Sequence, residues 1–127
     1  MSDSVSSSKA AAPVAAYSQA VNAGDLTFVS GQIPMDPASG ELVSSSIESA
    51  TAQSLSNVAR ILEAAGLSLN HVVKATVFLI DSDDYSGMDQ TYRKIMPEPF
   101  PAREAVFVKG LPKGSRVEIS VIAYRNN

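Results

Sequence analysis

An alternating run over residues 116–124 constrains the fold of this chain most strongly. Its odd positions are apolar and most of its even positions are not, so it has the period of a strand with one buried face. A second strand-like run at residues 104–109 precedes it, and the connection at 110–115 contains two glycines and a proline. The two runs therefore predict a β-hairpin, and the fold must contain a sheet that is covered on one face.

Arg103 enters this predicted hairpin from a stiff approach, Phe100-Pro101-Ala102. Proline fixes its own φ and restricts the preceding residue to extended conformations. Arg103 therefore loses little freedom when its planar guanidinium binds a carboxylate or a phosphate. Glu118 lies on the even face of the last strand. The two residues are open to two interpretations, a surface ion pair or two parts of a functional site.

Strand geometry separates Arg103 from Glu118 within the predicted hairpin. If the turn is centred near residues 112–113, Arg103 lies opposite about residue 122, and Glu118 is roughly 13 Å away along the partner strand. A direct ion pair within one hairpin is therefore disfavoured. Either a substrate and a water molecule lie between the two side chains, or the functional pair comes from different chains.

Composition removes several classes of chemistry. The 127 residues contain no cysteine and a single histidine, His71. They therefore offer no disulfide, no thiol nucleophile, no cysteine-based metal site and no multi-histidine metal site. The net charge is −3 and the lysines and arginines are scattered, which disfavours nucleic-acid binding.

The remaining elements follow in order along the chain. Residues 16–21 and 26–30 predict two strands joined as a hairpin. Residues 72–80 predict a strand that is buried on both faces, or covered by a partner subunit on one of them. Helices are predicted over residues 45–66 and 85–96. This order predicts an α/β (α+β) fold with a single mixed β-sheet and two helices packed on one face.

Local patterns refine the first helix and the start of the second. Ser45 and Glu48 have the spacing of a capping box, and Gly66 is placed to end the first helix in a left-handed conformation. The solvated face of this helix is predicted to carry Gln53, Asn57, Arg60 and Glu63. An acidic cluster that we expect to cap the second helix, rather than to bind metal, comprises Asp81, Asp83 and Asp84.

The first twelve residues are rich in serine and are predicted to form a flexible tail, followed by a single domain over residues 13–127. The tail lacks the hydrophobic centre of a secretory signal. No apolar run reaches the length of about 18–20 residues that crosses a bilayer. We expect a cytoplasmic protein without a membrane segment, with a mitochondrial location as the alternative.

Short motifs are spread along nearly the whole chain. They are Tyr17-Ser-Gln-Ala20, Val29-Ser-Gly-Gln-Ile-Pro34, Asn57-Val58 with Leu62-Glu-Ala-Ala-Gly66, Val73-Lys-Ala-Thr-Val-Phe78, Phe100-Pro-Ala-Arg103 and Val117-Glu-Ile119. Ser-Gly-Gln-Ile-Pro and Pro-Ala-Arg are specific when they occur together in this order and spacing. From about residue 12 to the C-terminus, the chain resembles the RidA/YjgF family of reactive-intermediate deaminases, also called the L-PSP endoribonuclease family.

The resemblance implies a chorismate-mutase-like fold that assembles as a homotrimer, with active sites in the clefts between subunits and with no cofactor or metal. It also implies hydrolysis of enamines and imines, such as 2-aminoacrylate and 2-iminobutyrate, to 2-oxo acids and ammonia. By position, Arg103 matches the arginine that holds the substrate carboxylate. Glu118 matches the glutamate associated with the catalytic water. The residues that match the rest of the cleft are Tyr17, Ser30 and Gly31.

Three positions depart from the family pattern. Ala15-Ala16 stand where many relatives carry Gly-Pro before the tyrosine, Asp89 stands where many carry asparagine, and Ala105 stands where cysteine is common. Two other functions also remain open. One is a trimeric module that captures small carboxylates through Arg103 without turnover. The other is endoribonuclease or translation-inhibitor activity, which the acidic composition disfavours.

Overall fold

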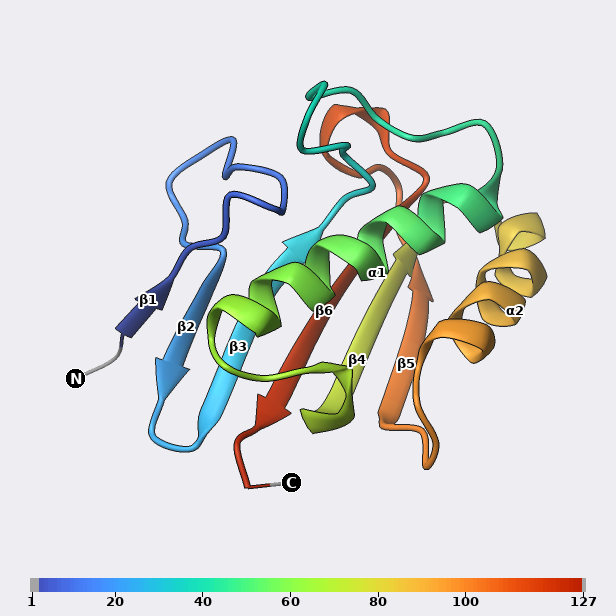
Figure 1. Cartoon of the computed structure of the whole chain (residues 1–127). Coiled ribbons are helices and arrows are strands. Elements are labelled where there is room, and N and C mark those ends of the chain that lie inside the picture. The colour runs from blue at the N-terminus through green and yellow to red at the C-terminus, as the bar shows by residue number, and fades with distance from the viewer. Residues whose placement is uncertain (1–2, 127) are drawn as a thin grey trace.

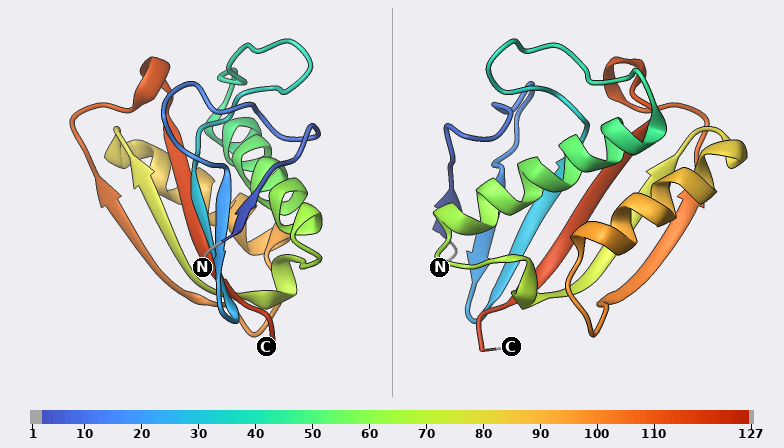
Figure 2. Two further views of the ribbon diagram at one scale, coloured as in Figure 1. Left: turned by 90° about the vertical axis from the view of Figure 1, so that its left-hand side faces the viewer. Right: turned by 45° about the vertical axis from the view of Figure 1, so that its right-hand side comes forward.

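A computed structural model describes residues 3–126 as one six-stranded sheet with two α-helices (Figure 1). The strand order is β1-β2-β3-β6-β4-β5. Both helices lie on the same face of the sheet and the opposite face is left open (Figure 2). The predicted fold class, a single mixed sheet with two helices on one face, is confirmed. The bounds are β1 Asp3–Val5, β2 Ala20–Ala23, β3 Leu26–Gln32, α1 Ile47–Ala64, β4 Val72–Leu79, α2 Tyr85–Ile95, β5 Ala102–Phe107 and β6 Val117–Tyr124.

The last two strands do not form the predicted hairpin. β5 lies parallel to β4 at the edge of the sheet, whereas β6 runs antiparallel to β4 on its other side, next to β3. Burial gives the physical reason. The residues of β6 that face the helices are almost fully buried, while β5 is exposed or half-exposed along its length. A strand with strict alternation buries most apolar surface when it lies in the centre of the sheet under α1. A strand with weak alternation has less apolar surface to bury and is tolerated at an edge.

The first hairpin is formed by β2 and β3, as predicted, with Gly24 and Asp25 as the two turn residues. Gly24 has a φ of +61°, the left-handed conformation that short hairpin turns require and that glycine adopts without strain. The strand predicted to begin at residue 16 begins at Ala20 instead. The four residues before it therefore belong to a loop.

The predicted flexible tail over residues 1–12 does not hold for the described part of that segment. β1 pairs antiparallel with β2, and both Val5 and Ala10 belong to the hydrophobic core. Gln19 is buried and its side-chain amide donates to the Ala11 carbonyl at 2.7 Å. A polar segment held by one buried glutamine gives no periodic signal in the sequence. The first two residues of the predicted tail lie outside the described part of the chain.

α1 begins one residue later than the predicted capping box. Ser46 is the N-cap and Ser49 completes the box, in place of Ser45 and Glu48. Ser46 Oγ accepts from the Ser49 amide at 3.0 Å, and Ser49 Oγ accepts from the Ser46 amide at 3.2 Å. Gly66 follows the helix with a φ of +78°, so its predicted left-handed role is confirmed.

Asn57, predicted on the solvated face of α1, is instead fully buried. Its side-chain amide donates to the Met35 carbonyl at 2.9 Å and to the Ile33 carbonyl at 3.4 Å. The interaction fixes the loop that follows β3 against the helix. Arg60 and Glu63, two other residues of the same predicted face, form an ion pair at the surface as expected.

The acidic cluster after β4 contains one cap and one buried ion pair. Asp81 accepts from the Asp83 amide at 2.9 Å and so caps the 3₁₀ turn that leads into α2. Asp84 is 7% exposed and receives two hydrogen bonds from Arg116, at 2.7 and 3.3 Å, which join the start of β6 to the start of α2. Among residues 3–126, no group of three or more acidic or histidine side chains is arranged to hold a metal ion. None of the helices in that range has the length and hydrophobicity that a membrane span requires.

The face of the sheet opposite the helices, called the open face below, carries a group of apolar side chains. On β4, the residues that point toward the helices are buried and those on the other side are half-exposed. Burial of β4 on both faces is therefore not observed within one chain. The large apolar residues of the open face are Leu26, Phe28, Phe78, Val106, Ile122 and Tyr124.

Candidate active site

Four of the five predicted site residues line a single pocket. Tyr17, Ser30, Gly31 and Glu118 border a cavity of about 370 Å³, here called the Glu118 pocket. Its other walls are Val14, Ala15, Ile33 and Pro112. Segments far apart in the sequence therefore meet where β3 ends and β6 begins.

A bulge in β3 makes room for the Glu118 carboxyl group. The register between β3 and β6 shifts between Val29 and Gln32, and Gly31 lies inside this interval. A Cβ atom at Gly31 would lie 2.7 Å from Cδ of Glu118, so the carboxyl group occupies space that only glycine leaves free. Burial raises the pKa of Glu118 above its ordinary value of 4.5, because the carboxylate has lost part of its hydration.

Ser30 and Tyr17 border the same pocket from β3 and from the loop before β2. Ser30 Oγ donates to the Ser18 carbonyl at 2.6 Å, which fixes the strand end to this loop. Tyr17 is exposed, and its hydroxyl oxygen accepts from the Val14 amide at 3.4 Å. The Ala15-Ala16 sequence before Tyr17 therefore does not keep this residue away from the pocket.

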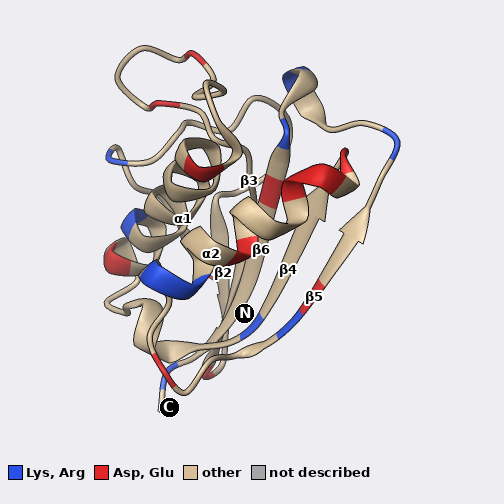
Figure 3. Ribbon diagram, turned by 90° about the vertical axis from the view of Figure 1, so that its right-hand side faces the viewer, with Lys and Arg blue, Asp and Glu red and all other residues tan. Residues whose placement is uncertain are grey.

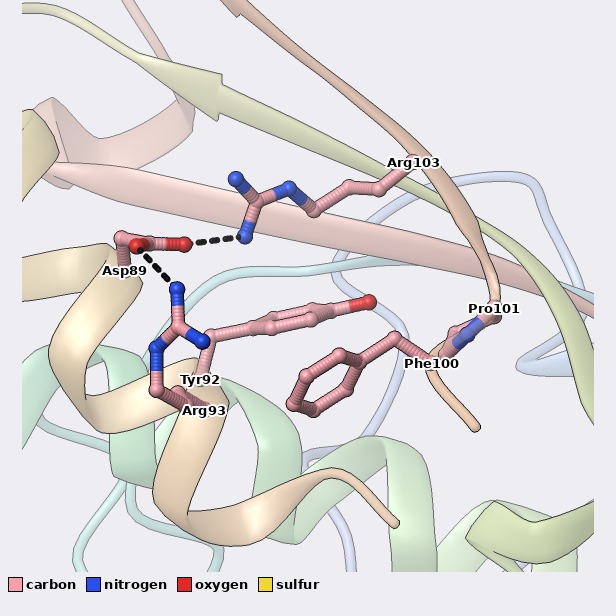
Figure 4. Close-up of a pocket in the computed structure, with 6 residues that line it drawn as sticks. All are labelled: Asp89, Tyr92, Arg93, Phe100, Pro101 and Arg103. Carbon is pink, nitrogen blue, oxygen red and sulfur yellow. Dashed lines mark hydrogen bonds and ion pairs between the residues drawn. The ribbon is translucent and has the colours of Figure 1, made fainter. Parts of the chain in front are cut away.

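Arg103 lies in a different cavity, on the helix side of the sheet (Figure 4). Its partner on β4 is Ala75, a fully buried residue beneath the helices. The side chain crosses toward α2 and borders a cavity of about 180 Å³ at the β5 edge of the sheet. This space, here called the Arg103 cavity, is lined by Asp89, Tyr92, Arg93, Phe100, Pro101 and Arg103.

α2 holds the Arg103 guanidinium at three points. Nη1 donates to Asp89 Oδ1 at 2.8 Å, and Nη2 donates to the Tyr85 hydroxyl at 2.9 Å. The guanidinium carbon also lies 4.7 Å from the centre of the Tyr92 ring, a cation–π contact. Residues 85, 89 and 92 have the spacing of one helix face, which is visible in the sequence. Their partnership with Arg103 requires β5 to lie beside α2, an arrangement that the predicted hairpin did not contain.

The charged groups of the Arg103 cavity partly compensate one another. Asp89 Oδ2 also accepts from Arg93 Nη2 at 3.4 Å, one helical turn further along α2. The hydrogen bond from Arg103 holds the pKa of Asp89 below its ordinary value, so Asp89 is ionised at neutral pH. Burial raises the pKa of Tyr92, whose hydroxyl oxygen has no hydrogen-bond partner within residues 3–126. The cavity thus combines two arginines with one carboxylate.

Arg103 and Glu118 face opposite sides of the sheet. Arg103 is in register with Val121 through Ala75, and Val121 points toward the helices. Glu118, three residues before Val121, points toward the open face. The separation of roughly 13 Å along a partner strand is wrong, because β5 and β6 are not neighbours. Within one chain the sheet stands between the two side chains, so one shared site would require two chains.

Sequence comparisons agree over almost the entire chain. A family model described as Endoribonuclease L-PSP matches residues 7–125. A RutC family protein of Pyrococcus horikoshii is 46% identical over 125 residues, which cover 98% of this chain and 99% of that protein. A 2-iminobutanoate/2-iminopropanoate deaminase of Capra hircus is 46% identical over 119 residues, which cover 94% of this chain and 87% of the goat protein.

Solved structures have nearly the same fold. RidA from the Antarctic bacterium Psychrobacter sp. PAMC 21119 is 42% identical and gives a TM-score of 0.93, covering 96% of this chain and 98% of its own. E. coli TdcF with bound serine is 34% identical and gives 0.92, covering 97% and 98%. The YjgF gene product of E. coli is 38% identical and gives 0.91, with the same coverage. This chain therefore belongs to the RidA/YjgF family, the family that the matching model describes as Endoribonuclease L-PSP.

Proposed function

We propose that this protein is an imine deaminase that hydrolyses small imino acids and their enamine tautomers, such as 2-iminobutyrate and 2-aminoacrylate, to 2-oxo acids and ammonia. Three relatives named 2-iminobutanoate/2-iminopropanoate deaminase are 44–46% identical over 94% of this chain. The observation that carries the proposal is the meeting of Tyr17, Ser30, Gly31 and Glu118 around one pocket.

Arg103 is proposed to bind the substrate carboxylate. Its guanidinium can offer two parallel N–H donors to a planar carboxylate, which a lysine ammonium cannot do. The contacts from Tyr85, Asp89 and Tyr92 hold it in one orientation before the substrate arrives. Less conformational entropy is then lost on binding, so more of the interaction energy appears as affinity.

Glu118 is proposed to position and deprotonate the attacking water. The enamine first takes a proton from solvent on its carbon, which gives the protonated imine. Water then adds its oxygen to the imine carbon while Glu118 accepts one of the two water protons, which leaves a carbinolamine with one hydroxyl and one amino group. Glu118 gives this proton to the amino group, ammonia leaves, and the hydroxyl proton passes to solvent, which yields the 2-oxo acid. Each step uses only side chains and water.

The active site is proposed to form between subunits of a homotrimer. Arg103 and Glu118 lie on opposite faces of the sheet within one chain, so only a second chain can bring an Arg103 cavity toward a Glu118 pocket. Arg103 is on the edge strand, where a neighbouring subunit has access. The apolar open face beside Glu118 supplies a surface that such a neighbour could bury.

The first test measures imine hydrolysis directly. A threonine dehydratase generates 2-iminobutyrate, and formation of 2-oxobutanoate is followed with and without the protein. Arg103→Ala is expected to abolish the acceleration, because the substrate loses its carboxylate anchor, while the oligomer persists. Full activity of Arg103→Ala would contradict the proposed mechanism.

The second test asks whether one site uses two chains. Arg103→Ala and Glu118→Gln subunits, each inactive alone, are unfolded together and refolded as mixed trimers. In an equal mixture, half of the subunits keep Arg103 and the other half keep Glu118. If each cleft takes Arg103 from one subunit and Glu118 from its neighbour, about a quarter of the clefts contain both groups, so about a quarter of the wild-type activity should return. Sites built within single chains would give no recovery.

A binding module without turnover is the second candidate function. The TdcF structure contains bound serine, a small molecule with a carboxylate. If this chain acts in the same way, calorimetry will detect binding of 2-oxo acids that depends on Arg103, and imine hydrolysis will not be accelerated. Endoribonuclease activity, which the family model names, remains disfavoured by the net charge of −3.

A further inference from the structure

The Arg103 cavity has one more cation than anion. Its charged lining residues are Arg93, Arg103 and Asp89. Asp89 accepts from Arg103 at 2.8 Å and from Arg93 at 3.4 Å, so the carboxylate bridges both cations (Figure 4). The side chains of Asp89 and Arg103 are 27% and 18% exposed, which limits screening by salt. One positive charge is left for a ligand.

We propose that Asp89 sets the charge selectivity of this cavity, so that it accepts imino acids with one carboxylate and rejects those with two. The proposal rests on the proposed function, in which Arg103 binds the substrate carboxylate. Asp89 acts through Arg103 and through its own charge, so it is a positioning and specificity-determining residue. With a neutral side chain at this position, the same cavity would hold two cations and no anion.

The hydrogen bonds of Arg103 explain the discrimination. A guanidinium group has five N–H donors, and Asp89 and Tyr85 each accept one of them. A substrate carboxylate on the remaining donors neutralises the one uncompensated charge. A second carboxylate in a small molecule then lies within about 8–10 Å of Asp89, the distance over which charges interact before salt screens them. With the first carboxylate bound, the charges of Arg93, Arg103 and Asp89 are balanced, so no uncompensated cation is left for the second carboxylate.

The test compares two ligands of nearly the same shape and different charge. 2-Oxoglutarate is a dianion, and 5-methyl-2-oxohexanoate carries two methyl groups where 2-oxoglutarate has its distal carboxylate oxygens. Calorimetry gives both dissociation constants for the wild-type protein and for Asp89→Asn, which keeps an oxygen acceptor for Arg103 and loses the charge. We expect the preference for the monoanion to fall by about tenfold or more in Asp89→Asn.

Two further variants separate charge from structure. Asp83→Asn removes the same charge from an exposed residue just before α2 and outside the cavity lining, so it should leave the preference unchanged. Asp89→Ala removes the charge and the acceptor, so it should lower the preference and also weaken binding of both ligands. In imine hydrolysis, the effect of Asp89→Asn should appear in the KM of a dianionic imine rather than in kcat.

The outcomes distinguish this inference from the proposed function. An unchanged preference in Asp89→Asn, with 2-oxobutanoate still bound, overturns the inference and leaves the proposed function intact. An equal change in Asp83→Asn also overturns it, because net charge rather than position would then set the selectivity. If the wild-type protein neither binds 2-oxobutanoate nor hydrolyses 2-iminobutyrate, the proposed function fails and the inference fails with it.

Discussion

Glu118 is half-buried at the start of β6, where its carboxylate is less hydrated than it would be at the surface. The missing side chain at Gly31 lets the carboxyl group pack directly against β3. Its raised pKa brings its proton affinity closer to neutral pH, where a general base is most effective. These two residues therefore work as a unit, since any side chain at position 31 would displace the carboxyl group.

The pH dependence of activity tests this role. Glu118 must be ionised to accept a proton from water, so kcat/KM should fall as the pH drops through its raised pKa, above the ordinary 4.5. Glu118→Gln should lose about 100-fold or more of the activity and should lack this acidic limb. The measurement is kcat/KM for 2-iminobutyrate across the acidic range, with substrate generated and consumed within each assay.

Protein stability provides the control for Glu118→Gln. The folded-state pKa is raised, so the fold favours the protonated form, and the stability that this contributes is lost as pH rises through that pKa. At neutral pH the ionised group is therefore unfavourable for folding, and Glu118→Gln should be at least as stable as the wild type. Two outcomes for Glu118→Gln would contradict the general-base role. One is a loss of activity that comes from unfolding, and the other is a pH profile of kcat/KM that still falls on the acidic side.

At the scale of elements, the sequence predicts the strands and helices well and one pairing wrongly. Period two identifies which face of residues 116–124 is buried, but it does not identify the neighbouring strand. The short connection between the two strands favoured a hairpin. The chain instead buries more apolar surface by placing β6 under α1 and β5 at the edge. Parallel pairing of β5 with β4 is a property of the whole sheet, which no local pattern contains.

The same limit applies to the candidate site. The motifs identified Tyr17, Ser30, Gly31 and Glu118, and the structure brings these residues to one pocket. The motifs also identified Arg103, but its partners on α2 depend on the position of β5 and were therefore missed. Asp89 was identified only as a departure from relatives. Its role depends on its ion pair with Arg103, which the sequence does not show.

Asn57 anchors the loop after β3 to α1, and its substitution tests how much this contact contributes to stability. Asn57→Ala leaves the buried Met35 carbonyl without its side-chain donor, whereas the Ile33 carbonyl still accepts from the Met35 amide, and the loss should cost about 1–3 kcal/mol in the free energy of unfolding. Because Ile33 lines the Glu118 pocket, KM should also rise. Urea denaturation at fixed protein concentration measures the first effect and steady-state kinetics the second.

Arg60→Ala on the same helix is the matched control for Asn57→Ala. Its ion pair with Glu63 lies at the surface, so its loss should change stability by no more than about 0.5 kcal/mol. An Asn57→Ala protein as stable as the control would mean that the loop after β3 is held by other contacts.

At the scale of the whole molecule, the surface around α2 and the open face differ in composition. Acidic residues are visible around α2 and its preceding turn, with a basic segment near the end of the helix (Figure 3). The open face holds apolar side chains, four of which are 37–42% exposed, together with the Lys74–Glu104 ion pair. An apolar group of this size on a sheet commonly marks a contact between proteins. If Arg103 and Glu118 act in one site, as proposed, a contact between subunits would also be needed to bring them together.

Phe28 is the residue that best tests assembly. It lies on the open face opposite Ile122 of β6, and it is 42% exposed, so an aspartate there should cost a single chain little. In a trimer the same aspartate would be buried without a partner and would oppose association. We expect light scattering to give about three times 13.3 kDa for the wild type and a much smaller mass for Phe28→Asp. Circular dichroism should show that the secondary structure is retained.

Ile95→Asp is the matched control for Phe28→Asp, because Ile95 is similarly exposed but lies on α2, away from the open face. It should remain trimeric and active. If Phe28→Asp dissociates, its activity should disappear even though every site residue is still present, because no chain can bring its own Arg103 to its own Glu118. A monomeric protein that still hydrolyses 2-iminobutyrate at the wild-type rate would show that the two residues do not act in one site. The mechanism would then have to be rebuilt on the Glu118 pocket alone.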